Sequence, residues 1–196
     1  MSVLYLYDFD GTITTKDSLF SFLKFATNKN KYSVILVRFI PLFILAKLGF
    51  LPKGETKRKF ISACLKGKTK AELNSLASNF LSKIKHTSFF REKALKSIER
   101  HNTKGDVYIV TASVDLWMND IANYLEVDLI CTQADFSNGI FNGKFLTPNC
   151  NYEEKPKRVM AAIDIDSYTE IYYYGDSKGD LAMKSLATNF FFNHFK

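Results

Sequence analysis

The chain has 196 residues, enough for one domain with a large insertion and a substantial hydrophobic core. Hydrophobic residues make up 46% and charged residues 24%, a balance that excludes intrinsic disorder and collagen-like repeats. The net charge of +7 is uneven: residues 16–104 contain 20 Lys and Arg against 5 Asp and Glu, whereas the remainder contains 7 against 15. The basic region suits either a solvated helical surface or an anionic partner, namely a phosphorylated substrate, a membrane surface or a nucleic acid.

Cys64, Cys131 and Cys150 lie far apart in the sequence and form no CxxC pair. We therefore expect reduced thiols in a reducing compartment rather than disulfides or a zinc site. The N-terminal segment MSVLYLYDFDGT lacks the basic region and the cleavage site of a secretory signal. These features predict a cytoplasmic protein, with membrane association left open by the apolar segment described below.

The first predicted element is the run SVLYLY from Ser2 to Tyr7, which ends at an acidic loop. A short apolar run of this kind is typical of a buried parallel strand. From Asp17 to Arg100 the apolar residues follow helical spacing, and glycines punctuate the pattern. We expect about five helices in this segment.

The segment from Tyr32 to Leu51 contains 20 mostly apolar residues, which is the length of a membrane span, although Arg38 and Pro41 interrupt it. A single span would separate Asp8 from Asp176, two residues that we expect in one site. Each half around Pro41 is too short to cross a bilayer. Two alternatives remain open: a buried helical pair, or a helix–turn–helix that contacts a membrane surface.

After Gly105, strand-like runs alternate with helical runs. Strands are expected at 106–113, 127–133, 169–177 and 189–195, helices at 114–125, 155–164 and 179–187, and a β-hairpin at 134–148 around Asn138-Gly139 and Asn142-Gly143. This alternation predicts an α/β fold with a Rossmann-like parallel sheet. Residues 1–15 and 105–196 would form the core, and residues 16–104 a helical cap inserted over the carboxyl edge of the sheet.

Three polar clusters follow strand-like runs: DFDGT at 8–12, TAS at 111–113 and GDSKGD at 175–180. Ligands of open α/β sheets bind outside the carboxyl ends of the strands, so we expect the clusters to converge on one crevice. The four carboxylates would repel one another there without a cation. A hard divalent ion with oxygen ligands, most simply Mg²⁺, meets this need and favours a phosphorylated substrate.

These motifs resemble those of the haloacid dehalogenase-like superfamily of phosphatases over nearly the whole chain. Residues 8–12 resemble its first motif, DxDGT, and IVTAS ending at Ser113 resembles its second. Lys155 resembles the lysine of the third motif, and GDSKGD resembles the fourth. The helical insertion resembles the phosphoserine-phosphatase-like branch. Within it, DGTITTKDS and the apolar run look most like bacterial relatives that include phosphatidylglycerophosphate phosphatases.

The resemblance implies roles for the acidic residues. Asp8 would be the nucleophile that forms an aspartyl-phosphate, and Asp10 the general acid and then the general base. Mg²⁺ would bind the Asp8 carboxylate, the Asp10 backbone carbonyl and Asp176. Asp180 would hold Lys155 or a metal-bound water from outside the ligand set, although it also suits the N-cap of the following helix.

The resemblance also implies contacts to the phosphoryl group. Thr111 would donate its hydroxyl, unless it is an ordinary residue at the end of a strand, and Lys155, with Lys157 as its competitor, would supply positive charge. The further substrate contacts expected around the phosphate are Thr12, Ala112 and Ser113.

Other positions concern substrate choice. Phosphoserine phosphatases usually have Asn where this chain has Gly179, and a glycine pair where it has Ala112-Ser113. Both differences argue against phosphoserine itself and leave phosphoryl transfer unaffected. Asp17 falls where that branch carries an acid that recognises the substrate, although it also suits a helix N-cap. Arg58 is the candidate cap cation for a substrate anion. The histidines, expected at the surface, are His86, His101 and His194.

The leading hypothesis is a Mg²⁺-dependent phosphomonoesterase that acts on a small phosphorylated metabolite or head group. One alternative is a lipid phosphatase with a phosphatidylglycerophosphate-like substrate, which docks residues 32–51 and the basic cap on anionic lipid. Another is a non-enzymatic nucleic-acid binder, which the absence of a recognisable binding module disfavours. A phosphotransferase also remains open, because an aspartyl-phosphate can pass its phosphoryl group to an alcohol.

Overall fold

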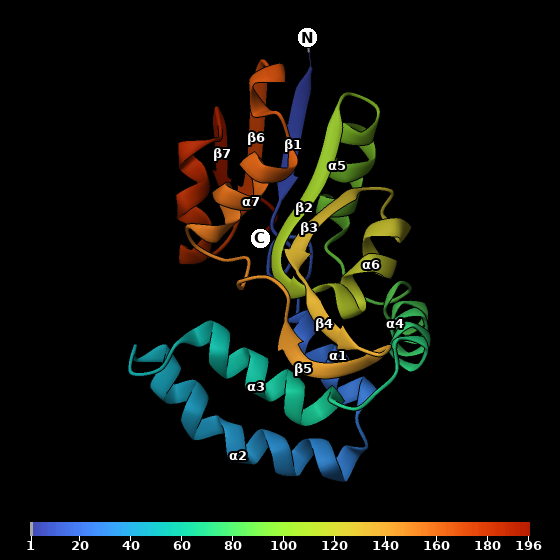
Figure 1. Ribbon diagram of the computed structural model, residues 1–196. Coiled ribbons are helices and arrows are strands. Elements are labelled where there is room, and N and C mark those ends of the chain that lie inside the picture. Colours follow the sequence, from blue (N-terminus) through green and yellow to red (C-terminus); the bar gives the residue numbers. More distant parts are fainter. Residues whose placement is uncertain (1) are drawn as a thin grey trace.

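The computed structural model describes residues 2–196. Its centre is a parallel five-stranded sheet in the order β3-β2-β1-β6-β7 (Figure 1). The strands are β1 (Val3–Tyr7), β2 (Asp106–Val114), β3 (Asp128–Thr132), β6 (Glu170–Gly175) and β7 (Asn189–Phe192). This arrangement confirms the predicted α/β fold with a Rossmann-like sheet, because each strand follows a helical crossover.

The alternation of side chains along the strands divides the core into two layers. Tyr5, Tyr7 and Tyr174 belong to the cluster on one face, and Leu6 and Tyr173 belong to the cluster on the other. The first face is covered by α5 (Glu92–Asn102) and α6 (Asp115–Tyr124). The second is covered by α7 (Glu154–Ala162) and by η2 (Lys178–Ser185), a 3-10 helix where an α-helix was expected; a short 3-10 turn, η1 (Ile165–Ser167), precedes β6.

His101, in the last turn of α5, is buried, so the expectation of a surface position is wrong for this histidine. Helical spacing places it on the same face as Ile98, which packs against the sheet. Its Nδ1 lies 2.7 Å from the hydroxyl oxygen of Tyr7, and its ring stacks on Tyr5 with 3.8 Å between centroids. Burial lowers the pKa of His101 to about 4. The other two histidines, His86 and His194, are exposed.

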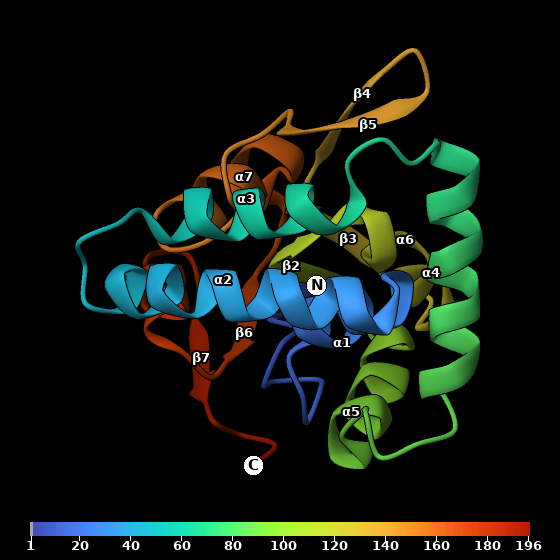
Figure 2. The ribbon, with the colours of Figure 1, turned by 90° about the horizontal axis from the view of Figure 1, so that it is seen from below.

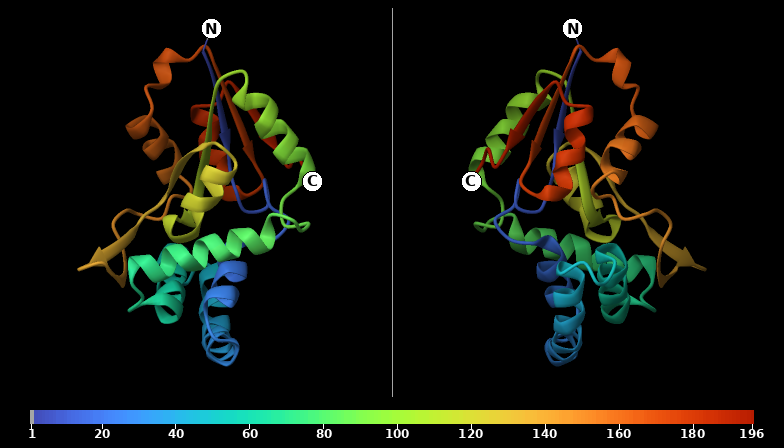
Figure 3. Two further views of the ribbon diagram at one scale, coloured as in Figure 1. Left: turned by 90° about the vertical axis from the view of Figure 1, so that its right-hand side faces the viewer. Right: turned by 90° about the vertical axis from the view of Figure 1, so that its left-hand side faces the viewer.

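The five helices expected between Asp17 and Arg100 divide into two groups. Four of them lie beyond the carboxyl ends of the strands (Figures 1 and 3): α1 (Ser18–Ala26), α2 (Lys29–Lys47), α3 (Lys53–Leu65) and α4 (Lys70–Ile84). The fifth, α5, packs on the sheet beside β2. We therefore propose that the cap comprises α1–α4 and that α5 belongs with the core.

A single helix replaces the buried helical pair that was one alternative for residues 32–51. α2 runs without a break from Lys29 to Lys47, with Pro41 inside it, so the expected division at Pro41 is wrong. Proline removes one backbone hydrogen bond from a helix, and Pro41 is exposed, where water can satisfy the freed carbonyl. Most of the outer side of α2 is likewise exposed rather than buried.

The expected hairpin is formed by β4 (Ala134–Ser137) and β5 (Ile140–Phe145). Its two-residue turn is Asn138-Gly139, in which both residues have positive φ. Asn142-Gly143 lies within β5 and is not a turn, which corrects the prediction. Gly143 has φ +84, and a Cβ there would lie 2.2 Å from Ser62 Oγ, so the missing side chain lets the hairpin approach α3.

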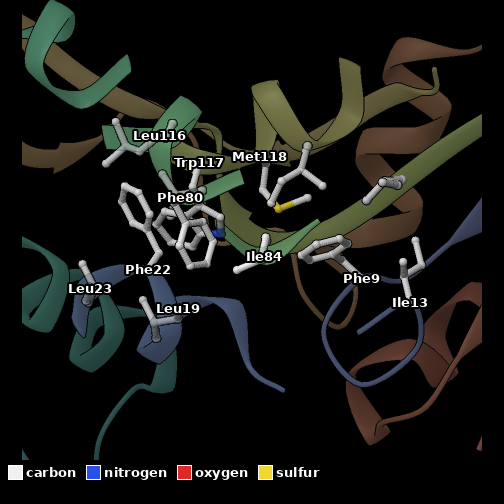
Figure 4. Close-up of a cluster of buried hydrophobic side chains, with 14 of the residues drawn as sticks. Phe9, Ile13, Leu19, Phe22, Leu23, Phe80, Ile84, Leu116, Trp117 and Met118 are labelled. Carbon is white, nitrogen blue, oxygen red and sulfur yellow. The ribbon is translucent and has the colours of Figure 1, made fainter. Parts of the chain in front are cut away.

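An aromatic cluster joins the cap to the core (Figure 4). Phe22 of α1 stacks on Trp117 of α6, with 5.1 Å between ring centroids, and meets Phe80 of α4 edge-on at 5.4 Å. All three side chains are buried. Packed aromatic groups of this size contribute several kcal/mol on truncation, so α1 and α4 are held firmly against α6.

Candidate active site

Acidic residues from two neighbouring strands meet at the carboxyl edge of the sheet. Asp8 follows β1, and Asp176 and Asp180 follow β6, which pairs with β1. Carboxylate oxygens of the three residues lie within 4.8 Å of one another. Thr111, near the end of β2 on the other side of β1, completes the convergence expected from the motifs.

Lys155 forms hydrogen bonds to two of the acidic residues, Asp8 and Asp180. Its Nζ donates to Asp8 Oδ1 at 2.5 Å, to Asp180 Oδ1 at 2.6 Å and to the hydroxyl oxygen of Tyr173 at 3.0 Å. The lysine is 1% exposed, and it begins α7, so the helix fixes its position. Burial alone would lower the pKa of Lys155, but Asp8, Tyr173 and Asp180 together hold it well above its usual value.

Burial raises the pKa of Asp8 to about 7, although Lys155 opposes this shift. Asp180 behaves in the opposite way: burial alone would raise its pKa, but the positive charge of Lys155, followed by the hydrogen bonds to the carboxylate, lowers it. Tyr173 donates to Asp180 Oδ1 at 2.6 Å. Sequence reasoning missed Tyr173, although strand alternation in EIYYYG already places it on the face that α7 covers.

Asp180 is fully buried and has donors on both carboxylate oxygens. Oδ2 accepts from the backbone N–H groups of Asp176 and Ser177 and from the Ser177 hydroxyl, while Oδ1 accepts from Lys155. It thereby forms a capping box with Ser177 at the start of η2. The N-cap of η2 is Ser177 rather than Asp180, so Asp180 is the third residue of the capping box and the partner of Lys155.

Gly11 allows Asp176 to approach the loop after β1. Its φ is +87, and a Cβ at this position would lie 2.2 Å from Asp176 Oδ2. Any side chain would therefore push the two loops apart. Asp176 is partly exposed, and Lys196 Nζ lies 3.0 Å from its Oδ2.

The Asp10 carboxylate is held by two serines. Oδ1 accepts from the backbone N–H of Ser18 at 2.6 Å, and Oδ2 accepts from the hydroxyls of Ser113 and Ser18 at 2.6 and 3.1 Å. Trp117 Nε1 donates to the Ser18 hydroxyl at 3.0 Å. The network fixes the carboxylate between cap and core. Neither Ser18 nor Trp117 was predicted as a site residue, although Ser18 ends the DGTITTKDS motif; no motif included Trp117.

The remaining predicted phosphate contacts surround Asp8 more loosely. The Thr12 hydroxyl donates to Asp8 Oδ2 over 3.5 Å, the long limit of a hydrogen bond. Thr111 is buried, and its hydroxyl oxygen accepts from the backbone N–H of Ser113 at 3.0 Å. The register of β2 against β3 shifts after Thr111, so the backbone leaves the regular ladder at this motif.

The cap cation nearest the acidic cluster is Lys57 rather than Arg58. Arg58 pairs with Glu55 at 2.6 Å and donates to the Gly143 carbonyl at 2.7 Å, so the structure does not bring it to Asp8. Lys57 Nζ instead donates to the Ala112 carbonyl at 2.6 Å. Burial lowers the pKa of Lys57, and the negative charges of Asp10, Asp17 and Asp8 counteract this effect.

Helical periodicity was the signal that could have identified Lys57. Position 57 lies in the middle of the helix face that carries Phe60, Ile61 and Cys64, which are buried, whereas position 58 lies at the edge of that face. The role expected for Arg58, as the cap cation for a substrate anion, stays a prediction.

Asp17 caps α1, because its Oδ1 accepts from the Phe20 backbone N–H at 3.2 Å. Loss of water around the carboxylate, together with the charge of Asp10, raises the pKa of Asp17 to about 6. The geometry thus favours the capping role, and the carboxylate also lies close enough to Lys57 to influence its charge.

The chemistry of the donor set fits a hard divalent cation. Asp8 and Asp176 each offer carboxylate oxygens within the 4.8 Å cluster. Asp180 is less suited to be a ligand, because Lys155, Tyr173 and backbone N–H groups already engage both of its oxygens.

Comparison with known proteins agrees with the geometry. The sequence profile of the haloacid dehalogenase-like hydrolases matches residues 5–184. Protein CicA of Caulobacter vibrioides is 32% identical over 188 residues, covering 94% of this chain and 83% of CicA. A protein of unknown function from Bordetella pertussis Tohama I superposes with a TM-score of 0.83 at 20% identity, covering 97% of this chain and 89% of that chain. A substrate-bound phosphoserine phosphatase superposes with a TM-score of 0.67 at 18% identity, covering 98% and 86%. The chain therefore belongs to the haloacid dehalogenase-like hydrolases.

Proposed function

We propose that the protein is a Mg²⁺-dependent phosphatase that hydrolyses a phosphomonoester through an aspartyl-phosphate on Asp8. The observation that carries this proposal is the buried Asp8–Lys155–Asp180 arrangement, in which one oxygen of Asp8 is held by Lys155. The second oxygen has only the long contact from Thr12 and is therefore the group available to attack phosphorus.

In the first half-reaction, Asp8 Oδ2 forms a bond to phosphorus while the bond from phosphorus to the ester oxygen breaks. Asp10 gives a proton to the departing alkoxide, and the hydrogen bonds from Ser18 and Ser113 fix its carboxyl group for that transfer. Lys155 and the hydroxyl of Thr111 offset the negative charge of the phosphoryl oxygens.

In the second half-reaction, Asp10 removes a proton from water, and the water oxygen attacks the phosphorus of the aspartyl-phosphate. The bond from Asp8 to phosphorus breaks, which releases inorganic phosphate and restores both carboxyl groups. The cap covers the carboxyl edge of the sheet, so it limits the access of bulk water to the acyl phosphate.

Mg²⁺, when bound by the Asp8 carboxylate, the Asp10 carbonyl and Asp176, would neutralise the charge between nucleophile and phosphate. Asp180 and Tyr173 would keep Lys155 beside Asp8, since their contacts leave the ammonium group little freedom. The transfer therefore depends on a carboxylate whose surroundings are fixed before substrate binds.

The substrate class that we propose is a small phosphorylated metabolite or a phosphorylated head group. The basic cap supports an anionic substrate, with Lys57 as the cap cation closest to the acidic cluster. A phosphatidylglycerophosphate-like lipid and the transfer of the phosphoryl group to an alcohol remain as finer alternatives. A nucleic-acid partner is disfavoured because the basic region contains no recognisable nucleic-acid-binding module.

The test is phosphate release from a panel of phosphorylated metabolites and short-chain lipid phosphates with Mg²⁺. Asp8→Asn is nearly isosteric but lacks the nucleophilic oxygen pair, so we expect turnover to fall to background while the far-UV circular dichroism is unchanged. The matched control is Asp166→Asn, at an exposed carboxylate remote from the cluster. Near-normal turnover in Asp8→Asn would exclude the covalent route. If more substrate is consumed than phosphate is released when glycerol is present, the protein would be a phosphotransferase, because some phosphoryl groups would have passed to glycerol.

A further inference from the structure

The outer side of the cap carries an uncovered row of large apolar side chains. We call it the outer stripe; it consists of Val34, Val37, Ile40, Ile44, Leu45, Leu48 and Phe50. Val37, Leu48 and Phe50 expose 65%, 66% and 75% of their surface, which is unusual for residues of this kind. Spacings of three and four residues place most of the stripe along one side of α2. A contiguous apolar surface of this length marks a contact site rather than a chance exposure.

Positive charge flanks the outer stripe on both edges. By helical spacing, Lys31 and Arg38 lie along one edge and Lys47 along the other, and all three side chains are exposed. From Ser18 to Gly54 the chain contains six Lys and Arg and no Asp or Glu. The segment that carries the stripe therefore contributes positive charge alone, which favours an occupant that is both apolar and anionic.

A hollow between α2 and α3 combines the same two properties. It has a volume of about 510 Å³ and is lined by the apolar residues Val34, Ile35 and Ala63 together with Asn30, Lys31 and Arg38. A hollow of this size with both apolar and cationic lining residues suits the glycerol region and phosphate of a phospholipid.

The position of α2 in the molecule suits a flat partner. Figures 1 and 3 place α2 at the end of the molecule farthest from the amino ends of the strands, and Figure 2 shows it lying lengthwise across that end. A helix of 19 residues is about 28 Å long, so the stripe extends across much of this face. Within residues 2–196, no helix is long and apolar enough to cross a bilayer.

From these observations we propose that the outer stripe docks the protein on the surface of an anionic phospholipid bilayer, with α2 lying in the interface. The apolar side chains enter the boundary between head groups and acyl chains, while the flanking cations pair with lipid phosphates. Charge selects the bilayer over a second copy of this chain, because two stripes face to face would bring six flanking cations together, three from each copy, with no Asp or Glu from residues 18–54 of either copy. The proposal concerns binding and is independent of the proposed catalysis.

The experiment is co-sedimentation of the full chain carrying Asp8→Asn with vesicles, which measures binding without turnover. We expect it to bind vesicles of equal parts phosphatidylglycerol and phosphatidylcholine and to remain in solution with pure phosphatidylcholine. Lys31→Gln with Arg38→Gln should weaken binding about 25-fold, since each cation near an anionic surface contributes about fivefold. Val37→Ser with Leu48→Ser should weaken binding by tenfold or more, because two apolar anchors are lost.

Matched controls separate the stripe from general surface properties. Leu146→Ser with Met160→Ser changes two comparably exposed apolar residues on other elements, and Lys93→Gln with Lys104→Gln removes two cations outside the stripe. Both controls should bind as the parent does.

Equal losses in test and control variants, or no binding to the anionic vesicles, would overturn the proposal. So would a dimer in sedimentation velocity that Val37→Ser with Leu48→Ser converts to monomer, since the stripe would then belong to a second copy. Stripe variants that retain Asp8 should hydrolyse p-nitrophenyl phosphate unchanged.

Discussion

Lys57 Nζ of the cap lies 2.6 Å from the carbonyl oxygen of Ala112 in the core, so a cap lysine contacts the strand that carries the second motif. The ammonium group is surrounded by the charges of Asp10, Asp17 and Asp8, and burial lowers its pKa against their influence. The contact links the cap to the second motif, as the hydrogen bond from Ser18 of the cap links the cap to Asp10.

Replacing that lysine should impair substrate binding. Lys57→Met keeps the length of the side chain and removes its charge, and we expect KM for an anionic metabolite to rise about tenfold or more, the usual effect of losing a charged hydrogen bond. The KM for p-nitrophenyl phosphate should rise less. Arg58→Met is the matched control and should change neither KM, because Arg58 pairs with Glu55. The measurement is steady-state kinetics with both substrates. A larger increase in KM from Arg58→Met than from Lys57→Met would assign the contact with the substrate anion to Arg58.

Replacing Asp180 should lower both the stability of the fold and the turnover number. Asp180→Ala leaves Lys155 buried without its 2.6 Å partner, and breaking a buried ion pair in this way costs about 3–5 kcal/mol. We expect the urea midpoint and the turnover number to fall together, with Asp166→Ala, at an exposed carboxylate, as the control. An unchanged midpoint would mean that water or another group replaces Asp180 beside Lys155.

Removal of divalent metal should abolish turnover reversibly. EDTA would leave Asp8 and Asp176 to repel each other and the incoming phosphate, so we expect phosphate release to stop and Mg²⁺ to restore it. Ca²⁺ should inhibit, because its larger and looser shell lets Asp8 bind the metal through both oxygens. The measurement is phosphate release during titration with each metal, and full activity in metal-free buffer would exclude the metal from the reaction.

Acid should destabilise the fold through His101. The pKa of His101 is about 4 in the folded chain against 6.5 for an ordinary histidine, so between these values the unfolded chain binds the additional proton. Stability is therefore fully present above about pH 6.5 and falls as pH decreases towards 4, by about 1–2 kcal/mol after allowance for solvent screening. Urea unfolding across this range should show a smaller loss in His101→Gln than in the parent. Parallel curves for the two proteins would remove His101 as the cause.

Much of the catalytic arrangement was predictable because its residues follow strands. Asp8 and Asp176 each come directly after a buried apolar run, and parallel strands bring their carboxyl ends to one edge whatever the rest of the chain does. Lys155 was identified by its motif, and the 2.5 Å contact with Asp8 places it where that motif implies. Tyr173 was also within reach of strand alternation, but nothing in the run of three tyrosines distinguished the one beside Lys155.

The arrangement of the cap was less predictable, because it depends on packing between segments that are far apart in the sequence. Apolar composition over 32–51 suggested burial, yet α2 leaves Val37 and Leu48 in solvent, since only one side of the helix contacts α3 and α1. Likewise, no local pattern places Trp117 against Ser18, because the two residues meet only when α1 and α6 pack together.

The order of hydrophobic and polar residues along the chain determined by itself the parallel sheet, the acidic edge at Asp8 and Asp176 and the helical insertion. These features depend on short-range periodicity and on the fixed geometry of crossovers. Only the tertiary structure decided that Lys57 donates to the carbonyl of Ala112 while Arg58 pairs with Glu55, that His101 is buried and that α2 presents an apolar outer side. Such choices depend on which helix faces find partners, and that depends on the packing of segments far apart in sequence.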